Sequence, residues 1–297
     1  MIDVLSRIRG GRRSSGWLPV VMLFVAMAVW GVSAQDVTLP GNPDSLKFAV
    51  ISDVHAEGDQ KEYAVAQQMA AVHAKFPFDM VITAGDNMNE SQSPRDFLDK
   101  FEKPFGPLLD AGVQFYATLG NHDSPSQRFY KPWNMGGDRY YTFARHNVRF
   151  FLLDSNVLDP PQLAWIDDAL KNARDDWKIC FLHHPPYSDG KTHGSQMGVR
   201  AALEPMFVKY GVNVVFTGHE HIYERITPQK GISWFVTGGG GPVRKGDTKP
   251  GAMTAAYFDQ DQTFMIVEVQ GDDLFFQAIS REGKSVDSGI IHRRPTT

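Results

Sequence analysis

The sequence of 297 residues contains a single cysteine, Cys180. One cysteine cannot form an intrachain disulfide, so a disulfide-stapled scaffold is excluded. Cys180 lies inside an apolar run, and we therefore expect a small buried side chain there rather than a reactive thiol. A metal site made of several cysteines is excluded as well.

The chain also lacks an excess of basic charge. The formal net charge is −4, and the first 34 residues carry +3, so the remainder carries −7. Binding to a phosphate backbone needs basic surface, and we expect no nucleic acid partner. Internal repeats and low-complexity segments are absent, and a single long apolar stretch occurs, near the N-terminus.

That stretch predicts an export signal. Basic residues 7–13 precede apolar residues 17–32, and the small residues up to Ala34 fit a cleavage site. We expect a periplasmic or secreted protein with no membrane association after cleavage; an uncleaved membrane anchor is the alternative, because the stretch is near the lower limit for spanning. The predicted division of the chain is a signal peptide at 1–34, a linker at 35–45 and one domain at 46–297.

Five apolar runs read as buried strands and end in polar residues of the kind that bind metals. In α/β proteins, ligands bind at the carboxyl ends of the strands, so these ends can gather distant side chains into one pocket. The run ends are Asp53-Val54-His55, Gly85-Asp86-Asn87, Gly120-Asn121-His122-Asp123, His183-His184-Pro185-Pro186-Tyr187 and Gly218-His219-Glu220-His221.

Strands and helices alternate through most of the chain, and further strands follow. This order predicts an α/β fold in which two sheets lie between helices, a four-layer α-β-β-α sandwich. Pro205 is expected to kink or shorten the last helix. The expected helices are 62–75, 96–105, 162–173 and 199–209, and the expected strands are 46–53, 80–86, 113–119, 140–143, 148–153, 177–182, 212–217, 222–227, 233–237, 263–269 and 274–280.

The side chains at the strand ends are His, Asp and Asn, a ligand set suited to Zn, Fe or Mn. Two carboxylates and several imidazoles exceed the four ligands of one tetrahedral ion, but they suffice for two ions that share a carboxylate. Two ions about 3.5–4 Å apart can clamp the attacking and leaving oxygens of a phosphoryl transfer. The pattern therefore indicates phosphoester hydrolysis with two metal ions, Fe, Mn or Zn.

In this order, the five motifs resemble the calcineurin-like metallophosphoesterase family over residues 46–221. Three segments are most similar to its purple and tartrate-resistant acid phosphatase branch. They are His183-x-Pro185-x-Tyr187, the run from Gly218 to Arg225, and Thr237 followed by four glycines. The glycine run lacks the Lys-Ser/Thr of a phosphate loop, and we expect it to supply unusual backbone angles beside the pocket.

The resemblance implies a role for each motif residue. A metal-bridging hydroxide would attack phosphorus, and His122 would contact the phosphate or protonate the leaving oxygen. Asp123 would orient His122, and His193 would face the substrate. The first metal would be held by Asp53, His55 and His221, the second by Asn121, His183 and His219, and Asp86 would bridge them.

The chain departs from the purple enzymes at one ligand. These have a tyrosine three residues after the Gly-Asp aspartate and a glycine two residues after the first aspartate, where this chain has Asn89 and His55. His55 would replace the tyrosinate. We therefore expect no tyrosinate–iron charge-transfer colour in protein loaded with Fe(III).

Three functions fit these motifs. The leading one is an exported phosphomonoesterase acting on a small-molecule phosphate ester. The alternatives are a phosphodiesterase on the same scaffold, of the cyclic nucleotide or glycerophosphodiester type, and a non-catalytic metal-bound recognition module.

His184 is a rival to His183 as the ligand, since adjacent strand residues point to opposite faces.

Overall fold

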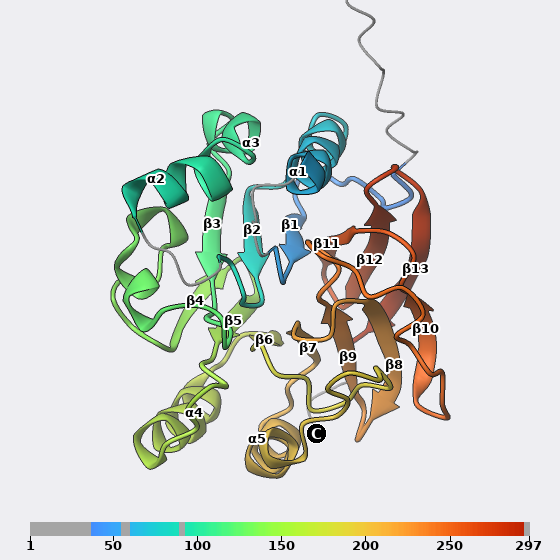
Figure 1. The fold of residues 1–297 in the computed structure, drawn as a ribbon. Coiled ribbons are helices and arrows are strands. Elements are labelled where there is room, and N and C mark those ends of the chain that lie inside the picture. The colour runs from blue at the N-terminus through green and yellow to red at the C-terminus, as the bar shows by residue number, and fades with distance from the viewer. Residues whose placement is uncertain (1–36, 55–59, 89–92, 294–297) are drawn as a thin grey trace, which may run out of the picture. The chain divides into compact units, whose positions relative to one another are not determined.

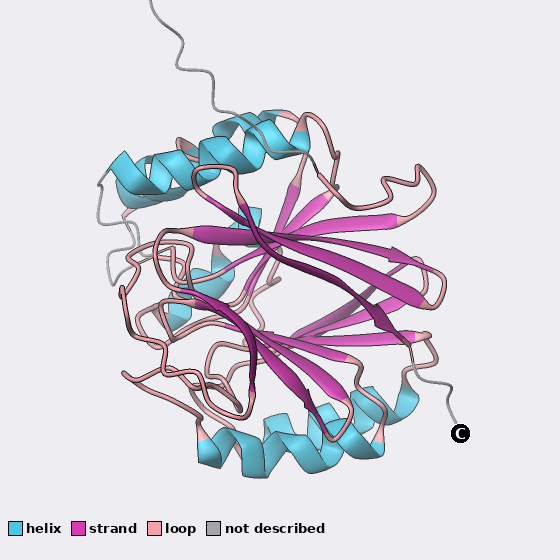
Figure 2. Ribbon diagram, turned by 90° about the vertical axis from the view of Figure 1, so that its right-hand side faces the viewer, coloured by secondary structure: helices cyan, strands magenta, loops and turns pink. Residues whose placement is uncertain are grey.

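The computed structural model describes residues 37–54, 60–88 and 93–293. Two sheets lie face to face, with helices on both outer faces (Figure 2). The predicted four-layer α-β-β-α sandwich is confirmed. The predicted export signal and His55 are outside the described residues.

The first sheet has the order β13-β12-β11-β1-β2-β3, and its three adjacent strands β1, β2 and β3 run parallel. Its outer face carries α1, α2, a π-helical turn at Leu98–Glu102, and α3 (Figure 1). The elements are β1 (Leu46–Ile51), α1 (Gln60–His73), β2 (Met80–Thr83), α2 (Pro94–Phe97), α3 (Gly106–Asp110), β3 (Gln114–Ala117), β11 (Thr263–Gln270), β12 (Asp273–Ser280) and β13 (Ser285–His292).

The second sheet has the order β10-β8-β9-β7-β6-β5-β4, in which β5, β6, β7 and β9 run parallel. Helices α4 and α5 cover its outer face (Figure 1). Its elements are β4 (Tyr141–Arg145), β5 (Val148–Leu152), α4 (Pro160–Asn172), β6 (Trp177–Phe181), α5 (Met197–Lys209), β7 (Val214–Thr217), β8 (Tyr223–Gln229), β9 (Ile232–Thr237) and β10 (Thr254–Phe258).

Both faces of the central strands are buried, because alternate side chains enter different cores. In β1, Phe48 and Val50 join the core between the sheets, whereas Ala49 and Ile51 pack beneath α1 and α3. Cys180 on β6 is fully buried under α4 and α5, as expected. Burial raises the pKa of its thiol well above the ordinary value.

Several parts of the chain differ from the sequence-based expectation, among them the unexpected helix α3. Helix α5 runs through Pro205 without a break, so the proline does not shorten it. Strands β10 and β13 were not expected; both are sheet edges with partly exposed side chains, and they lack a continuous apolar run. Residues 37–45, predicted as a linker, bind the body: Glu268 on β11 accepts hydrogen bonds from the backbone N–H groups of Gly41 and Asn42.

Candidate metal centre

Asp53 and Asp86 stand just beyond the carboxyl ends of the parallel strands β1 and β2. Both have left-handed backbone angles, φ +54° and φ +50°, which non-glycine residues rarely adopt. The N–H of Asp53 donates to the carbonyl of Gly85 at 3.0 Å, which ties the two strand ends together. Both carboxylates are buried.

His183 brings the second sheet to these carboxylates. One ligand atom each from Asp53, Asp86 and His183 lie within 4.8 Å of one another, and all three side chains are buried. The Nε2 of His183 is 3.3 Å from Oδ2 of Asp86 and 3.0 Å from Oδ1 of Asn121, which follows β3. Four of the predicted residues therefore converge from strands β1, β2, β3 and β6.

Two imidazoles are turned so that Nε2 faces the carboxylates. Nδ1 of His183 is 3.0 Å from the carbonyl of Ala84, and Nδ1 of His221 is 2.7 Å from the carbonyl of Pro242. A hydrogen bond from Nδ1–H to a carbonyl leaves Nε2 available to a metal, an arrangement typical of metal-binding histidines. Nε2 of His221 lies 3.5 Å from Oδ1 of Asp53.

His219 completes the group from the end of β7. Its backbone also has a positive φ, +71°, and its N–H donates to Oδ2 of Asp53 at 2.9 Å. The rings of His219 and His193 stack with centroids 4.0 Å apart, and the ring of His184 lies 4.5 Å from His219. His193, predicted to face the substrate, thus lies against a proposed ligand.

The charges of this region favour a cation. Burial by itself lowers the pKa of His183, but the nearby carboxylates of Asp53 and Asp86 raise it to about 9. Burial and the neighbouring imidazoles lower the pKa of His219 to about 3, which keeps its ring neutral. Without metal the protonated His183 compensates the carboxylates, and a bound cation would take the place of its proton. Buried carboxylates, imidazoles and an amide oxygen fit ions that take oxygen and nitrogen ligands.

His184 lies beside this cluster, but its hydrogen bonds go to Ser155 and not to the carboxylates. Its Nδ1 lies 2.9 Å from the hydroxyl of Ser155, and that hydroxyl also accepts the N–H of His184. Burial lowers its pKa to about 4. This geometry favours His183 over its rival as the ligand, although the ligand assignment stays a prediction.

His122 is exposed at the mouth of the centre, and its N–H donates to Oδ1 of Asp86 at 2.9 Å. Asp123 is buried, and its carboxylate accepts four hydrogen bonds from N–H groups of the two strand-end loops. Burial raises its pKa to about 6. These contacts fix the loops after β2 and β3, and the orientation of His122 by Asp123 stays a prediction. The donors are the backbone N–H groups of Gly120, Asn87 and Met88 and the side-chain amide of Asn87.

Glycines around the centre permit close approach of the chain. A β-carbon at Gly120 would lie 2.0 Å from the carboxylate of Asp86, and one at Gly218 would lie 2.3 Å from that of Asp53. The glycines of the run 238–241 also permit close approach of neighbouring chain segments. None of them has a positive φ, so the expectation of unusual backbone angles there is wrong. A β-carbon at Gly241 would lie 2.4 Å from the carbonyl of Asp53.

The supporting roles of two residues, Glu220 and Asn156, were not predicted from the sequence. Glu220 is fully buried between two proposed ligands, and its Oε1 accepts the N–H groups of His193 and Gly194 at 2.5 Å, so it fixes that loop. The side-chain amide of Asn156 donates to the carbonyl of Gly120 at 3.1 Å. The sequence does contain one signal for the orientation of Glu220. Successive side chains of an extended segment point to opposite faces, so Glu220 points away from the face that its two histidine neighbours share.

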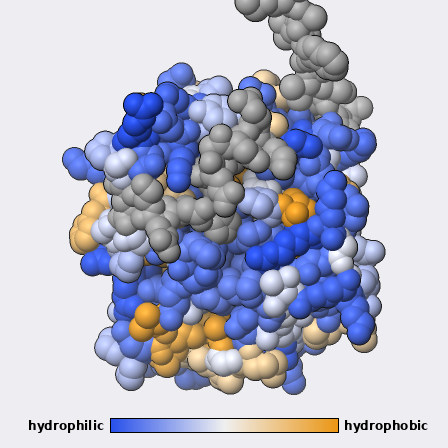
Figure 3. Space-filling view, in the orientation of Figure 1, coloured by the Kyte–Doolittle hydropathy of each residue, from blue (hydrophilic) through white to orange (hydrophobic). Residues whose placement is uncertain are grey.

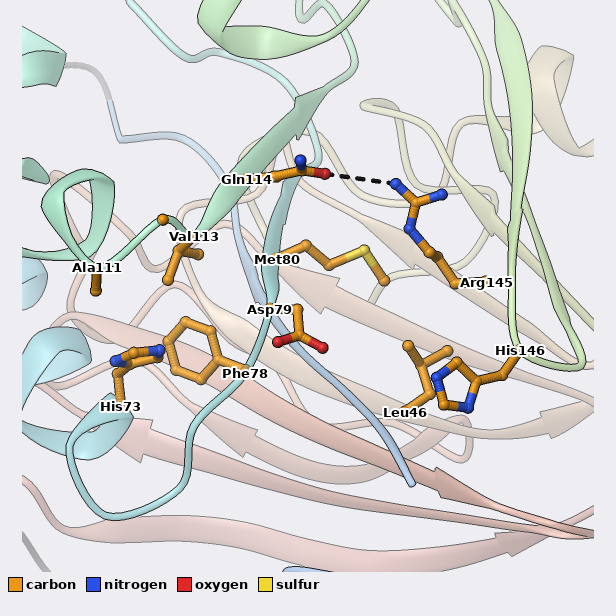
Figure 4. A pocket seen from close by; sticks show the side chains of 11 residues that line it. Leu46, His73, Phe78, Asp79, Met80, Ala111, Val113, Gln114, Arg145 and His146 are labelled. Atoms are coloured by element: carbon orange, nitrogen blue, oxygen red, sulfur yellow. Dashed lines mark hydrogen bonds between the residues drawn. The ribbon is translucent and has the colours of Figure 1, made fainter. Parts of the chain in front are cut away.

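A pocket of about 360 Å³ lies at the opposite edge, where β1, β2 and β3 begin (Figure 4). It is lined by side chains such as His73, Asp79 and Arg145, and it contains none of the proposed ligands. The guanidinium of Arg145 is already bonded to Gln114 and Tyr116. In the part of the chain that the structure describes, no helix has the length and apolar character needed to cross a membrane.

Comparison with known proteins gives consistent matches. The family model described as calcineurin-like phosphoesterase matches residues 46–223. Tartrate-resistant acid phosphatase type 5 of Rattus norvegicus is 23% identical over 279 residues, covering 79% of this chain and 85% of its own. The purple acid phosphatase from yellow lupin seeds superimposes with a TM-score of 0.69 at 20% identity, over 86% of this chain and 55% of its own. GAP50, an inner membrane complex anchor of Plasmodium, superimposes with a TM-score of 0.73 at 16% identity. The match covers 84% of this chain and 90% of GAP50.

Proposed function

The chain belongs to the calcineurin-like phosphoesterase family and is a metal-dependent phosphoric ester hydrolase, and from this premise we propose that it is an exported phosphomonoesterase with two metal ions. The observation that carries the proposal is the group of Asp53, Asp86 and His183, whose ligand atoms lie within 4.8 Å in a buried position. Two buried carboxylates this close are costly unless a cation compensates them.

We assign the ligands as two sets that share one residue. Ligand atoms of Asp86 lie within 4.8 Å of those of Asp53, a member of the first set, and of His183, a member of the second. Asp53 is next to His221, and Asn121 is next to His183. The first set is Asp53, His55 and His221, the second is Asn121, His183 and His219, and Asp86 bridges them.

Bound metal ions would supply Lewis acidity and a nucleophilic water near neutral pH. The chain itself would hold and protonate the substrate. His122 is exposed beside Asp86, where it can give a proton to the leaving oxygen. His193, fixed by Glu220 and stacked on His219, is placed to contact the phosphate or its ester group.

Preference for monoesters is supported by the relatives and by the sequence. The relative from Rattus norvegicus is named an acid phosphatase, and the segments around His183 and His221 resemble that branch. The predicted export signal makes an intracellular second messenger a poor substrate. The Plasmodium neighbour is described as an anchor, so the fold alone does not establish catalysis.

The test compares kcat/KM for an aryl phosphate monoester and the matching bis-aryl diester. The protein is prepared without metal and loaded separately with Mn, Zn and Fe, and bound metal is counted. The proposal expects two ions per chain and a strong monoester preference, both lost in Asp86→Ala. A strong diester preference contradicts monoesterase function. Two bound ions with no turnover of either ester support a recognition module.

A further inference from the structure

Two large apolar side chains are exposed on the face that carries the metal centre. Val157 precedes α4 and is 50% exposed, and Met197 begins α5 and is 61% exposed. Both helices begin after strands β5 and β6 end, so their first residues lie at the same edge as the proposed ligands. Single exposed apolar residues are common in proteins, and the meaning of this pair depends on its surroundings.

Both residues are anchored to one loop of the centre, His184-Pro185. Ser155, two residues before Val157, bonds the ring and the N–H of His184. Gln196, directly before Met197, donates its N–H to the carbonyl of Pro185 at 2.8 Å. Val157 and Met197 therefore both belong to chain segments that are bonded to the same short loop.

The loop leads directly to the metal centre. The ring of His184 is 4.5 Å from the ring of His219, and Asn156 donates to the carbonyl of Gly120, next to Asn121. Hydrogen bonds of Ser155 and Gln196 to this loop thus connect the surroundings of the proposed ligands with the chain segments that carry Val157 and Met197.

Partly buried neighbours extend these two residues into a surface. Leu158 and Val199 follow them and pack on the core beneath α4 and α5. We call Val157, Leu158, Met197 and Val199 the apolar rim. Figure 3, seen from the side of the metal centre, shows hydrophobic residues gathered in the lower part of this face, over α4 and α5.

We propose that the apolar rim binds the organic group of the substrate, so that the enzyme prefers phosphate esters of hydrophobic alcohols. This inference rests on the proposed phosphoesterase function. A phosphate held at the metal ions presents its ester oxygen to the surroundings of His122 and His193, and an alkyl group attached there can extend over His184 onto the rim. Covering exposed apolar side chains with an alkyl chain removes both surfaces from water.

The experiment is a chain-length series of alkyl phosphate monoesters, from ethyl to hexyl, each below its micelle-forming concentration. Leaving alkoxides in this series have nearly equal basicity, so changes in kcat/KM report binding of the chain. Full burial of one methylene is worth about fourfold, and a half-covered methylene about twofold. We expect kcat/KM of the full, metal-loaded chain to rise about twofold per added carbon.

The double variant Val157→Asn with Met197→Gln is expected to flatten this rise. Val208→Asn is the matched control, because Val208 is 46% exposed on the same helix but at its far end; this variant should keep the wild-type slope. A flat series in the wild type, or an unchanged slope in the double variant, overturns the role of the rim while leaving the phosphoesterase intact. No turnover of any ester by protein that holds two metal ions overturns the proposed function and this inference together.

Discussion

The side-chain oxygen of Asn121 lies 3.0 Å from Nε2 of His183, although 62 positions separate the two residues. Asn121 follows β3 in the first sheet and His183 follows β6 in the second. The contact therefore joins the two sheets at the edge where their parallel strands end. Since the proposed ligands come from both sheets, the metal centre can form only when the sheets are packed together.

We expect His183→Ala to lose metal and His184→Ala to keep it. Nε2 of His183 faces Asp86 and Asn121, whereas His184 bonds Ser155. Metal analysis after gel filtration should find at most one ion per chain in the first variant and two in the second. The adjacent histidines are matched controls for each other, and the reverse result would make His184 the ligand.

His122→Gln should lower kcat by about 10²- to 10⁴-fold, the usual contribution of a general acid. The backbone N–H that His122 donates to Asp86 is kept in this variant, so bound metal should be unchanged. Activity on an ester with a very good leaving group should fall less, because that group leaves without a proton. His146→Gln, far from the motifs, serves as the control; an unaltered kcat in His122→Gln would exclude the assigned role.

Asp123→Asn should cost about 2–4 kcal/mol of stability. Its carboxylate accepts four N–H donors, and an amide group would turn its own donors toward some of them. Urea unfolding of metal-free protein measures the loss, with the exposed Asp138→Asn as the control. If Asp123 also orients His122, the acidic limb of the pH–rate profile will move. Wild-type stability in the variant would argue against the loop-fixing role.

Stability should fall at alkaline pH. Burial raises the pKa of Tyr141 and Tyr223 well above the ordinary value, so the folded chain keeps protons that the unfolded chain releases above about pH 10. The unfolded state then binds fewer protons, and the free energy of unfolding decreases as the pH rises.

Tyr141→Phe removes one of these groups, so the slope of stability between pH 10 and 11.5 should become shallower by up to about 1.4 kcal/mol per pH unit. The comparison is with Tyr257→Phe, since Tyr257 is 46% exposed. Urea unfolding across this pH range gives both slopes. Equal slopes in the two variants would show that Tyr141 does not carry the effect.

The layers of the fold were predictable because its central strands are apolar on both faces. β1, β2, β6 and β7 appear in the sequence as largely apolar runs, interrupted by Lys47 and Lys178, and each contributes to two cores. Helix α3 was not predicted, because its five residues are too few to show the periodicity of apolar residues typical of a helix. β13 alternates with polar residues at an open edge, and its pairing with β12 defines it.

The convergence of Asp53, Asp86, Asn121 and His183 could be predicted because parallel strands end at a common edge. The roles of the glycines and of Glu220, which support these four residues, could not be predicted. The sequence does not reveal whether a glycine serves an unusual backbone angle or the close approach of another chain segment. In the run 238–241 the glycines serve close approach. The role of Glu220 depends on a loop 26 residues away along the chain, which no local pattern encodes.

Asp53, Asp86 and His219 all have left-handed backbones, a conformation that costs of order 1–3 kcal/mol at each non-glycine residue. We expect metal binding by the proposed ligands to offset this strain, since it would also neutralise the buried carboxylates. The supply of metal would then set how much folded protein is present, as well as its activity. Under metal limitation the unfolded fraction should rise, and abundance and activity should decline together.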